Sequence, residues 1–324
     1  MDRPGKKRDM KLSVIIPGYN TPDAWWDRCL KSVIAALPDE SEIVCVDDGS
    51  KVRPQPTVDA PSIRWICLEK NVGQSAARNI ALKSAVGEYV TFVDSDDEVC
   101  GDVYRHCLDN LNRDEADVAV FGARTIWTGL GLYKDDAVCE APSGPLTDAV
   151  AESLYRGCLL EYTWNKVYRR SFLAKNAIRL PEGLCPGEDT IFNLQVIRAK
   201  AVWTFVNVIG YVYYRYDGSS LSRYLPTNLL ATRTRADLWK SVFSFAHNEC
   251  TEEENLKSEW ENIWRHDSPI SYLERYRFAR SYGYCFVDML VKTFVRRFLY
   301  GKLVRRWRMR RMYPYAQAWR DDKR

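Results

Sequence analysis

Acidic side chains gather in one short stretch of this sequence. Residues 92–99 read FVDSDDEV, so that Asp94, Asp96, Asp97 and Glu98 follow directly on an apolar run. Two carboxylates about 4 Å apart repel each other by roughly 4 kcal/mol at an effective dielectric constant of about 20. A protein tolerates this in a solvated turn, or where a cation lies between the acids. Carboxylate oxygens at this spacing suit Mg²⁺ or Mn²⁺.

A second acidic cluster favours the cation over the solvated turn. Asp47 and Asp48 close another apolar run, EIVCVDDGS at 42–50. A divalent ion held by one or two carboxylates commonly binds a nucleotide diphosphate through its remaining positions. Neither a GxxxxGK[ST] phosphate loop nor the spacing of an EF-hand occurs in the sequence, and its three histidines are dispersed. The acids therefore predict a nucleotide site that uses Mn²⁺ or Mg²⁺ as a cofactor.

The apolar runs before these clusters have the pattern of buried strands. Continuous apolar strands in strand–helix–strand order predict an α/β fold, with a mostly parallel sheet flanked by helices in a Rossmann-like arrangement. Ligands of such sheets bind at the carboxyl ends of the strands, so we expect PGYN (17–20), DDGS (47–50) and DSDD (94–97) to meet at one edge. The predicted strands are 12–16, 42–50, 62–69, 88–94 and 117–122, and the predicted helices are 27–37 and 74–86.

The pattern is less regular after about residue 125. Segments 163–173 and 186–200 each predict a turn followed by a helix, and two strands are expected within 201–216. From about residue 226 the chain has helical spacing with little strand signal. We therefore predict a first domain at 1–222 and a helical C-terminal region at 223–324.

The basic residues of the chain concentrate at its C-terminal end. From Lys292 onward there are 12 basic and 2 acidic residues, whereas the first 291 residues hold 35 basic and 41 acidic ones. Between 287 and 312, apolar residues recur at helical spacing and basic residues fill much of the opposite side, which is typical of a helix at the surface of an anionic membrane. A docked helix with a solvated basic face is the alternative. Nucleic-acid binding is not expected, because these residues match no recognised module.

Cysteine usage and hydropathy favour a cytoplasmic protein. The 10 cysteines are scattered with no CxxC pair, which is typical of reduced, mostly buried thiols. The first residues lack the apolar core of a secretory signal, and no stretch approaches the roughly 18 apolar residues of a membrane-spanning helix. We expect any membrane contact to be peripheral, at the inner face of the cell membrane.

Six stretches of the sequence carry a resemblance to a known family. In order they are SVIIPGYN, IVCVDDGS, NVGQSAARNIAL, GEYVTFVDSDDEV, NKVYRRSFL and GEDTIF, and together they span roughly residues 11–222. Each stretch alone is a weak signal. Their order and spacing resemble those of family 2 glycosyltransferases, which have the GT-A fold and invert the configuration of the transferred sugar.

The resemblance implies donor and metal contacts for the motif residues at the strand ends. In the family, the first motif lies against the nucleotide base and the DDGS turn contacts uracil. The Ala-Arg-Asn segment brings a basic residue to the nucleotide, and the Asp-x-Asp motif reaches the ribose and the ion. The implied nucleotide-sugar contacts are Pro17, Tyr19, Asn20, Asp48, Arg78, Asp94 and Ser95. The implied metal ligands are Asp96, which is favoured, and Asp94, with Asp97 as a competitor.

The resemblance also implies a catalytic base in GEDTIF, at Asp189. An acceptor hydroxyl loses its proton as it attacks the sugar carbon, and a partly desolvated carboxylate within hydrogen-bond reach can take that proton. The alternative is structural, because a helix dipole stabilises any carboxylate in the first helical turn. Contacts with the acceptor or the diphosphate are expected of Trp164, Asn165, Lys166, Glu188, Arg215 and Arg223, with core packing or a solvated surface as the alternative.

These features predict an inverting hexosyltransferase with a nucleotide-sugar donor, UDP being the favoured nucleotide, and a glycan or lipid-linked acceptor. The resemblance connects such an enzyme with bacterial surface polysaccharide, as in capsule or lipopolysaccharide, and leaves a homodimer open. One alternative is a metal-dependent nucleotidyltransferase, which usually has a glycine-rich basic loop after the first strand that PGYN lacks. The other is an inactive nucleotide-binding subunit.

Overall fold

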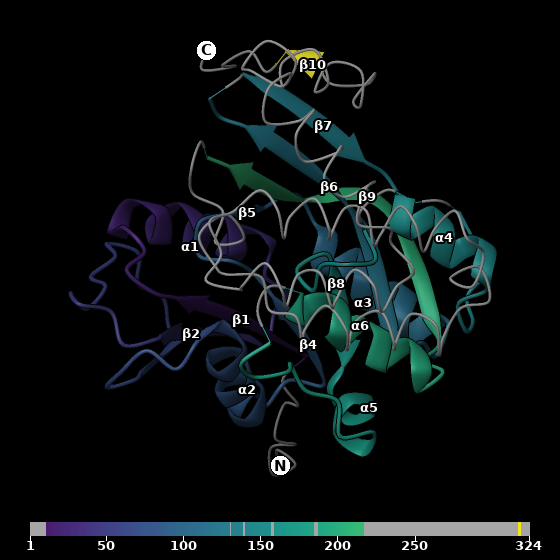
Figure 1. The fold of residues 1–324 in the computed structure, drawn as a ribbon, viewed down its shortest axis with the longest axis horizontal. Coiled ribbons are helices and arrows are strands. Elements are labelled where there is room, and N and C mark those ends of the chain that lie inside the picture. The colour runs from purple at the N-terminus through teal and green to yellow at the C-terminus, as the bar shows by residue number, and fades with distance from the viewer. Residues whose placement is uncertain are drawn as a thin grey trace, which may run out of the picture.

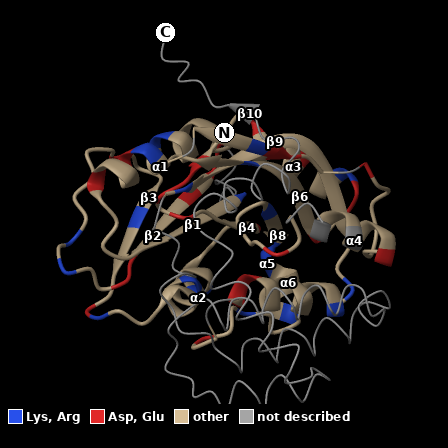
Figure 2. Ribbon diagram, turned by 45° about the horizontal axis from the view of Figure 1, so that its top comes forward, with Lys and Arg blue, Asp and Glu red and all other residues tan. Residues whose placement is uncertain are grey.

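The computed structural model describes residues 11–129, 131–138, 140–156, 159–184, 187–216 and 317–318. Within these ranges the chain forms one β-sheet between two layers of helices (Figure 1). Figure 2 shows α1 (Asp23–Ala36) and α3 (Val103–Arg113) on one face of the sheet, with α2 (Gln74–Ser84) and α6 (Glu188–Arg198) on the other. The predicted α/β class is therefore confirmed.

The first half of the sheet is parallel and buried. Its strands are β1 (Leu12–Gly18), β2 (Ser41–Asp47), β3 (Ile63–Cys67) and β4 (Tyr89–Phe92), in the order β3-β2-β1-β4. All residues of β1 and β2 are buried, as expected for strands that helices cover on both faces. The register pairs Gly18 with Asp47, so that β1 and β2 end side by side.

The second half of the sheet is mixed. Strand β8 (Lys166–Arg169) lies antiparallel between β4 and β6 (Val118–Trp127). Strand β6 pairs in parallel with β9 (Trp203–Arg215) and in antiparallel with β7 (Leu132–Asp136). The short strands β5 (Glu98–Val99) and β10 (Gln317–Ala318) pair with β9 and β7.

Two local predictions for this half were wrong. Residues 166–169, expected in a turn, form β8, and helix α5 (Arg170–Lys175) begins only after it. The two strands expected within 201–216 are one strand, β9, which continues through Gly210. A Cβ atom at Gly210 would lie 2.3 Å from Cγ2 of Val103 on α3, so glycine lets β9 pass beneath that helix. Helix α4 (Asp148–Arg156) was not predicted.

The polar loops that follow β1, β2 and β4 meet at one edge of the sheet, as the sequence predicted. The amide of Asp48 donates a hydrogen bond of 2.9 Å to the carbonyl of Gly18. The hydroxyl groups of Thr21 and Ser95 share a hydrogen bond of 2.8 Å. These bonds connect the loop after β1 with both of its neighbours, so the three motifs form one surface.

Several predictions lie outside the described residues. They concern the helical region at 223–324 apart from 317–318, its amphipathic segment, and Arg223. In the described part of the chain, no helix is long and apolar enough to span a membrane. The five described cysteines are unpaired.

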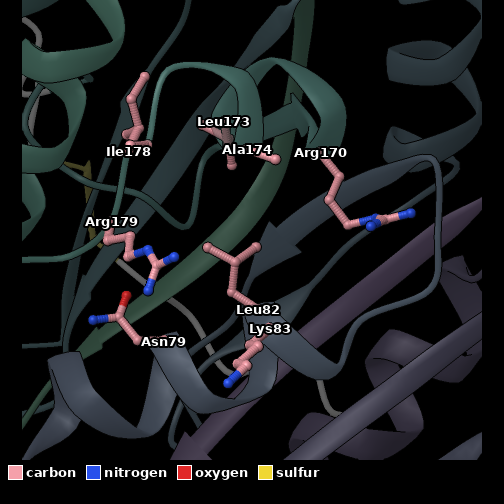
Figure 3. Close-up of a pocket in the computed structure, with 9 residues that line it drawn as sticks. Asn79, Leu82, Lys83, Arg170, Leu173, Ala174, Ile178 and Arg179 are labelled. Carbon is pink, nitrogen blue, oxygen red and sulfur yellow. The ribbon is translucent and has the colours of Figure 1, made fainter.

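A cavity of about 220 Å³ lies between α2 and α5 (Figure 3). Leu82, Leu173 and Ile178 supply apolar lining, and Lys83 and Arg179 line it as well. Since α2 ends at Ser84 and leads into the start of β4, this cavity is at the opposite edge of the sheet from the motif loops. It is therefore separate from the site that those loops form.

Gly49 sets the shape of the turn after β2. Its φ angle is +69°, and a Cβ atom there would lie 2.3 Å from the carbonyl carbon of Lys70. We expect Gly49→Ala to lower the free energy of unfolding by about 2–4 kcal/mol, through backbone strain and this clash, as measured by chemical denaturation. Gly101 is the matched control, with a φ of +64° and open space around it. A loss as large in Gly101→Ala would contradict the role of the Lys70 contact.

Candidate active site

A buried guanidinium joins two of the acidic motifs. Arg78 lies on α2 with 1% of its side chain exposed. Its Nη2 is 2.5 Å from Oδ1 of Asp94, and its Nη1 is 2.8 Å from Oδ1 of Asp189. Burial opposes the charge on Arg78, but the Asp189 and Asp94 carboxylates more than offset this and raise its pKa. Three residues from separate sequence motifs thus form one ion-pair network.

Asp97 is buried and holds the loop after β4 in place. Its Oδ1 accepts a hydrogen bond of 2.8 Å from the amide of Tyr214, and its Oδ2 accepts one of 2.9 Å from the Tyr211 hydroxyl. Burial, with the charges of Asp96 and Asp94, raises the pKa of Asp97 well above its usual range. Because both of its oxygens are engaged inside the protein, Asp97 is poorly placed to compete with Asp96 for an ion.

Asp96 is held in this loop through its backbone. Arg28 donates to the Asp96 carbonyl and pairs with Glu98 at 3.0 Å, which attaches the loop to α1. The Asp96 carboxylate itself forms no ion pair with any side chain in the described ranges. Burial and the neighbouring charge of Asp94 raise its pKa to about 6. A carboxylate crowded in this way has the properties of a ligand for a divalent cation.

The residues present fit a divalent ion between Asp94 and Asp96. Arg78 and Gln74 both donate to Oδ1 of Asp94, so Oδ2 of Asp94 and the Asp96 carboxylate are the oxygens that would hold an ion. Among the described residues there is no cluster of three or more His, Cys, Asp or Glu side chains that could hold a metal. An ion here would therefore take its other ligands from a bound diphosphate and from water.

Asp189 is the second residue of α6, and 16% of its side chain is exposed. While its Oδ1 pairs with Arg78, its Oδ2 is 3.4 Å from the amide nitrogen of Thr163, a long and weak hydrogen bond. Oδ2 is thus the oxygen better able to accept a proton from a ligand. The helix dipole also favours a carboxylate here, so the catalytic role of Asp189 stays a prediction.

The predicted contacts with the base lie around the end of β1. Pro17 is buried in β1, whereas Tyr19 is 46% exposed. Asn20 has a φ of +52°, and its amide donates a hydrogen bond of 2.8 Å to Oγ of Ser50. Tyr19 therefore projects from a turn that is fixed to the neighbouring DDGS loop, which suits a ring that stacks on a base.

Asp48 has a structural role that the sequence analysis missed. Its Oδ1 accepts a hydrogen bond from the amide of Val72 at 2.8 Å, and its Oδ2 accepts one from the amide of Gly73 at 3.0 Å. The side chain of Asn71 also donates to Oδ2 at 2.9 Å. Asp48 thus shapes the loop that leads into α2 and carries Arg78. If Asp48 also contacted uracil, it would do so with a carboxylate that already accepts hydrogen bonds from this loop.

Lys166 lies inside the protein. Its Nζ donates to the carbonyl of Leu159 at 2.6 Å and to Oδ1 of Asn165 at 2.7 Å. Burial lowers the pKa of Lys166 well below its usual range. Asn165 is equally buried and donates to the carbonyl of Leu159. The geometry therefore gives no support to the predicted contact of these two side chains with an acceptor or a diphosphate.

Among residues 164–166, Trp164 is the one that contacts a residue of the site. Its ring is 3% exposed and stacks on Tyr211 with 4.3 Å between ring centroids. Tyr211, which the sequence analysis did not single out, accepts a hydrogen bond from the Asp94 amide at 3.0 Å. The aromatic residues of GYVYYRY predicted a strand, but they did not show which face of that strand lies against Asp94. Glu188 is buried at the start of α6, and Arg215 ends β9.

Solved structures share this fold. A crystal structure of S. aureus TarS in complex with UDP-GlcNAc aligns with a TM-score of 0.60 and 20% sequence identity, over 84% of this chain and 79% of that one. The TarS complex with UDP aligns with a TM-score of 0.54, over 86% and 77%. The architecture is therefore the GT-A fold, in which helices flank the sheet. In this chain the acidic residues lie at the ends of the strands.

The family follows from the sequence motifs that build this site. The profile of "Glycosyl transferase family 2" matches residues 13–176, just over half of the chain, and the chain belongs to this family. It is 30% identical over 232 residues to the uncharacterized glycosyltransferase YibD of Escherichia coli K12, across 69% of this chain and 63% of that protein. It is 28% identical over 227 residues to the poly(ribitol-phosphate) beta-glucosyltransferase of Bacillus spizizenii, across 67% and 34%. The chain thus matches about six tenths of one relative and a third of the other.

Arg78 should be essential for stability as well as for the site. We expect Arg78→Gln to lower the free energy of unfolding by about 3–5 kcal/mol, because it leaves two partly buried carboxylates without their cation. Chemical denaturation measures this. Arg105→Gln is the control, since Arg105 pairs with Asp102 at 3.9 Å on an exposed surface, and we expect a change below about 0.5 kcal/mol. Similar small losses in both variants would contradict the role assigned to Arg78.

Proposed function

We propose that this chain is an inverting glycosyltransferase that moves a sugar from a UDP-sugar to a hydroxyl group of a glycan or lipid-linked acceptor. The Asp94–Arg78–Asp189 network carries the proposal, because it joins the implied metal ligand to the implied base. Family membership and the fold shared with UDP-GlcNAc-bound TarS support the donor class. Similarity to a poly(ribitol-phosphate) beta-glucosyltransferase and to the succinoglycan biosynthesis protein ExoO supports a role in surface polysaccharide assembly.

In this proposal the donor lies across the ends of β1, β2 and β4. Tyr19 contacts the base, and Asp94 and Asp96 are the residues that would hold Mn²⁺ or Mg²⁺. When bound, such an ion acts as a Lewis acid that stabilises the negative charge of the leaving group. Arg28 supports this role, because it fixes the Asp96 backbone to α1 and so presents the carboxylate from a rigid loop.

Asp189 supplies the base in the proposed reaction. The acceptor oxygen attacks the anomeric carbon of the sugar, the bond from that carbon to the diphosphate oxygen breaks, and the configuration inverts. Oδ2 of Asp189 takes the proton of the attacking hydroxyl, while Arg78 holds the other oxygen at 2.8 Å and fixes the orientation of the carboxylate. Because Arg78 also binds Asp94, the base keeps a fixed position relative to the donor.

Asp96 should carry the metal dependence of donor binding. A ligand that binds the folded state alone stabilises it by about 2.7 kcal/mol at a concentration of 100 Kd, so we expect Mn²⁺ to enlarge the rise in Tm that UDP causes. Asp96→Asn should abolish this Mn²⁺-dependent part. Asp102→Asn, which changes an exposed acid just beyond the loop, should retain it. An unchanged Mn²⁺ effect in Asp96→Asn would rule out the proposed ligand.

Asp189 should control the chemical step and not the binding of the donor. With UDP-GlcNAc as donor and water as acceptor, we expect Asp189→Asn to slow the release of UDP by about 10²–10⁴-fold. The affinity for UDP, measured by calorimetry, should change little. Asp102→Asn, which changes an exposed acid outside the network, is the control and should have a much smaller effect on the rate. UDP release at the wild-type rate in Asp189→Asn would refute the assignment of the base.

A further inference from the structure

One face of strands β7, β6 and β9 continues from the site along the sheet. The register pairs Ala123 of β6 with Asp136 of β7 and Tyr211 of β9. Two residues further along, Thr125 pairs with Lys134 and with Tyr213. Since side chains alternate between the faces of a strand, these rows share one face. Successive rows on it lie about 7 Å apart.

This face is hollow along its middle strand. Ala123 and Thr125 are small, whereas the neighbouring positions on β7 and β9 carry long or aromatic side chains. A cavity of about 50 Å³ lies over these residues, lined among others by Lys134, Asp136 and Tyr213. The hollow thus follows from the choice of small residues on β6 between larger ones on both sides.

Aromatic rings form one wall of this hollow, which we call the β6 cleft. Tyr162 and Trp164 line it with Tyr213. Trp164 stacks on Tyr162 with 4.8 Å between ring centroids, and the rings of Tyr162 and Tyr213 are 6.0 Å apart. Ligand sites commonly combine such flat apolar surfaces with a few fixed polar groups. Trp164 is 3% exposed and stacks on both Tyr162 and Tyr211, so the half-buried rings of Tyr162 and Tyr213 form the accessible part of this wall. Their faces suit the C–H surface of a sugar ring, and their hydroxyl groups suit its polar edge.

The opposite wall is polar. Lys134 and Asp136 form an ion pair of 2.5 Å, and their side chains are only 19% and 13% exposed. An ion pair held at the edge of a cleft offers both donors and acceptors to the hydroxyl groups of a sugar. Arg215, which pairs in register with Trp127 one row further along, extends the polar surface away from the site.

The β6 cleft touches the catalytic network at two points. Tyr211, in the row nearest the site, contacts the amide of Asp94 through its hydroxyl and Trp164 through its ring. The amide of Thr163, between Tyr162 and Trp164, is the group nearest to Oδ2 of Asp189. The aromatic wall of the cleft is therefore connected, through Tyr211 and the backbone of Thr163, to Asp94 and Asp189.

From this geometry we propose that the β6 cleft is the acceptor site, and that it binds a saccharide whose ring stacks on Tyr162 and Tyr213 while the Lys134–Asp136 pair binds its hydroxyl groups. This inference rests on the proposed transferase function, because that function requires an acceptor next to the base. A lipid carrier, where there is one, lies outside the cleft, since the cleft recognises the sugar itself.

The test compares saccharide binding with nucleotide binding in the full-length chain. Fluorescently labelled protein, with UDP present, is applied to an array of neutral, uronate-containing and phosphate-containing saccharides. Two variants change the cleft: Thr125→Trp fills it, and Tyr213→Ala removes part of its aromatic wall. Arg124→Gln is the matched control on the opposite face of β6, where Arg124 pairs with the half-exposed Asp135. Calorimetry with UDP is run on all four proteins.

We expect the wild type to bind a subset of the saccharides. Tyr213→Ala should bind them about tenfold more weakly, the effect of losing one aromatic contact, and Thr125→Trp should bind them at least as weakly, because its indole occupies the cleft. Arg124→Gln should bind like the wild type, and the affinity for UDP should be equal in all four. Unchanged saccharide binding in Thr125→Trp would overturn the proposal. So would a wild type that binds UDP but none of the saccharides. A wild type that binds saccharides in the cleft but no UDP would support the cleft and refute the proposed donor.

Discussion

The architecture of the site depends on a single buried positive charge. A guanidinium with 1% exposure is tolerated only where carboxylates and hydrogen bonds compensate for its lost hydration. Asp94 and Asp189 provide this compensation from positions 16 and 111 residues away along the chain. Helix α2, the end of β4 and the start of α6 must therefore keep one relative arrangement. Asp48 contributes at a distance, because it shapes the loop from which α2 begins.

The acids crowded after β4 have different tasks, and their surroundings separate them. Asp94 faces Arg78, and Asp97 accepts hydrogen bonds from Tyr211 and Tyr214 within the protein. Burial and the neighbouring charge of Asp94 also destabilise the ionised form of Asp96, whose carboxylate has no such partner among the ion pairs of the described residues. Arg78 and the two tyrosines thus compensate the charges of Asp94 and Asp97, but not that of Asp96. Asp96 is therefore the side chain that would gain most from the proposed cation.

Local patterns predicted the strands and loops that the first motifs need. Strands β1 and β2 are continuous apolar runs, so their burial and the convergence of the loops behind them follow from the sequence alone. Strand β8 was missed because its four residues include Lys166, whose charge hides a fully buried position. The continuity of β9 through Gly210 depends on contact with Val103, a residue far away in the sequence. Likewise, no local pattern shows that Arg78 faces two carboxylates rather than solvent or a nucleotide.

The position of Arg78 changes how it can act on a donor. The family resemblance implied a contact with the nucleotide, but both terminal nitrogens of Arg78 bind carboxylates and its Nε is buried. Its influence on a ligand must then pass through Asp94, whose negative charge it partly compensates. Because Arg78 compensates part of its charge, Asp94 would attract a divalent ion less strongly than an unpaired carboxylate would. The affinity for the ion would then depend more on Asp96 and on the diphosphate. Because such coupling is reciprocal, the ion and the nucleotide should each strengthen the binding of the other.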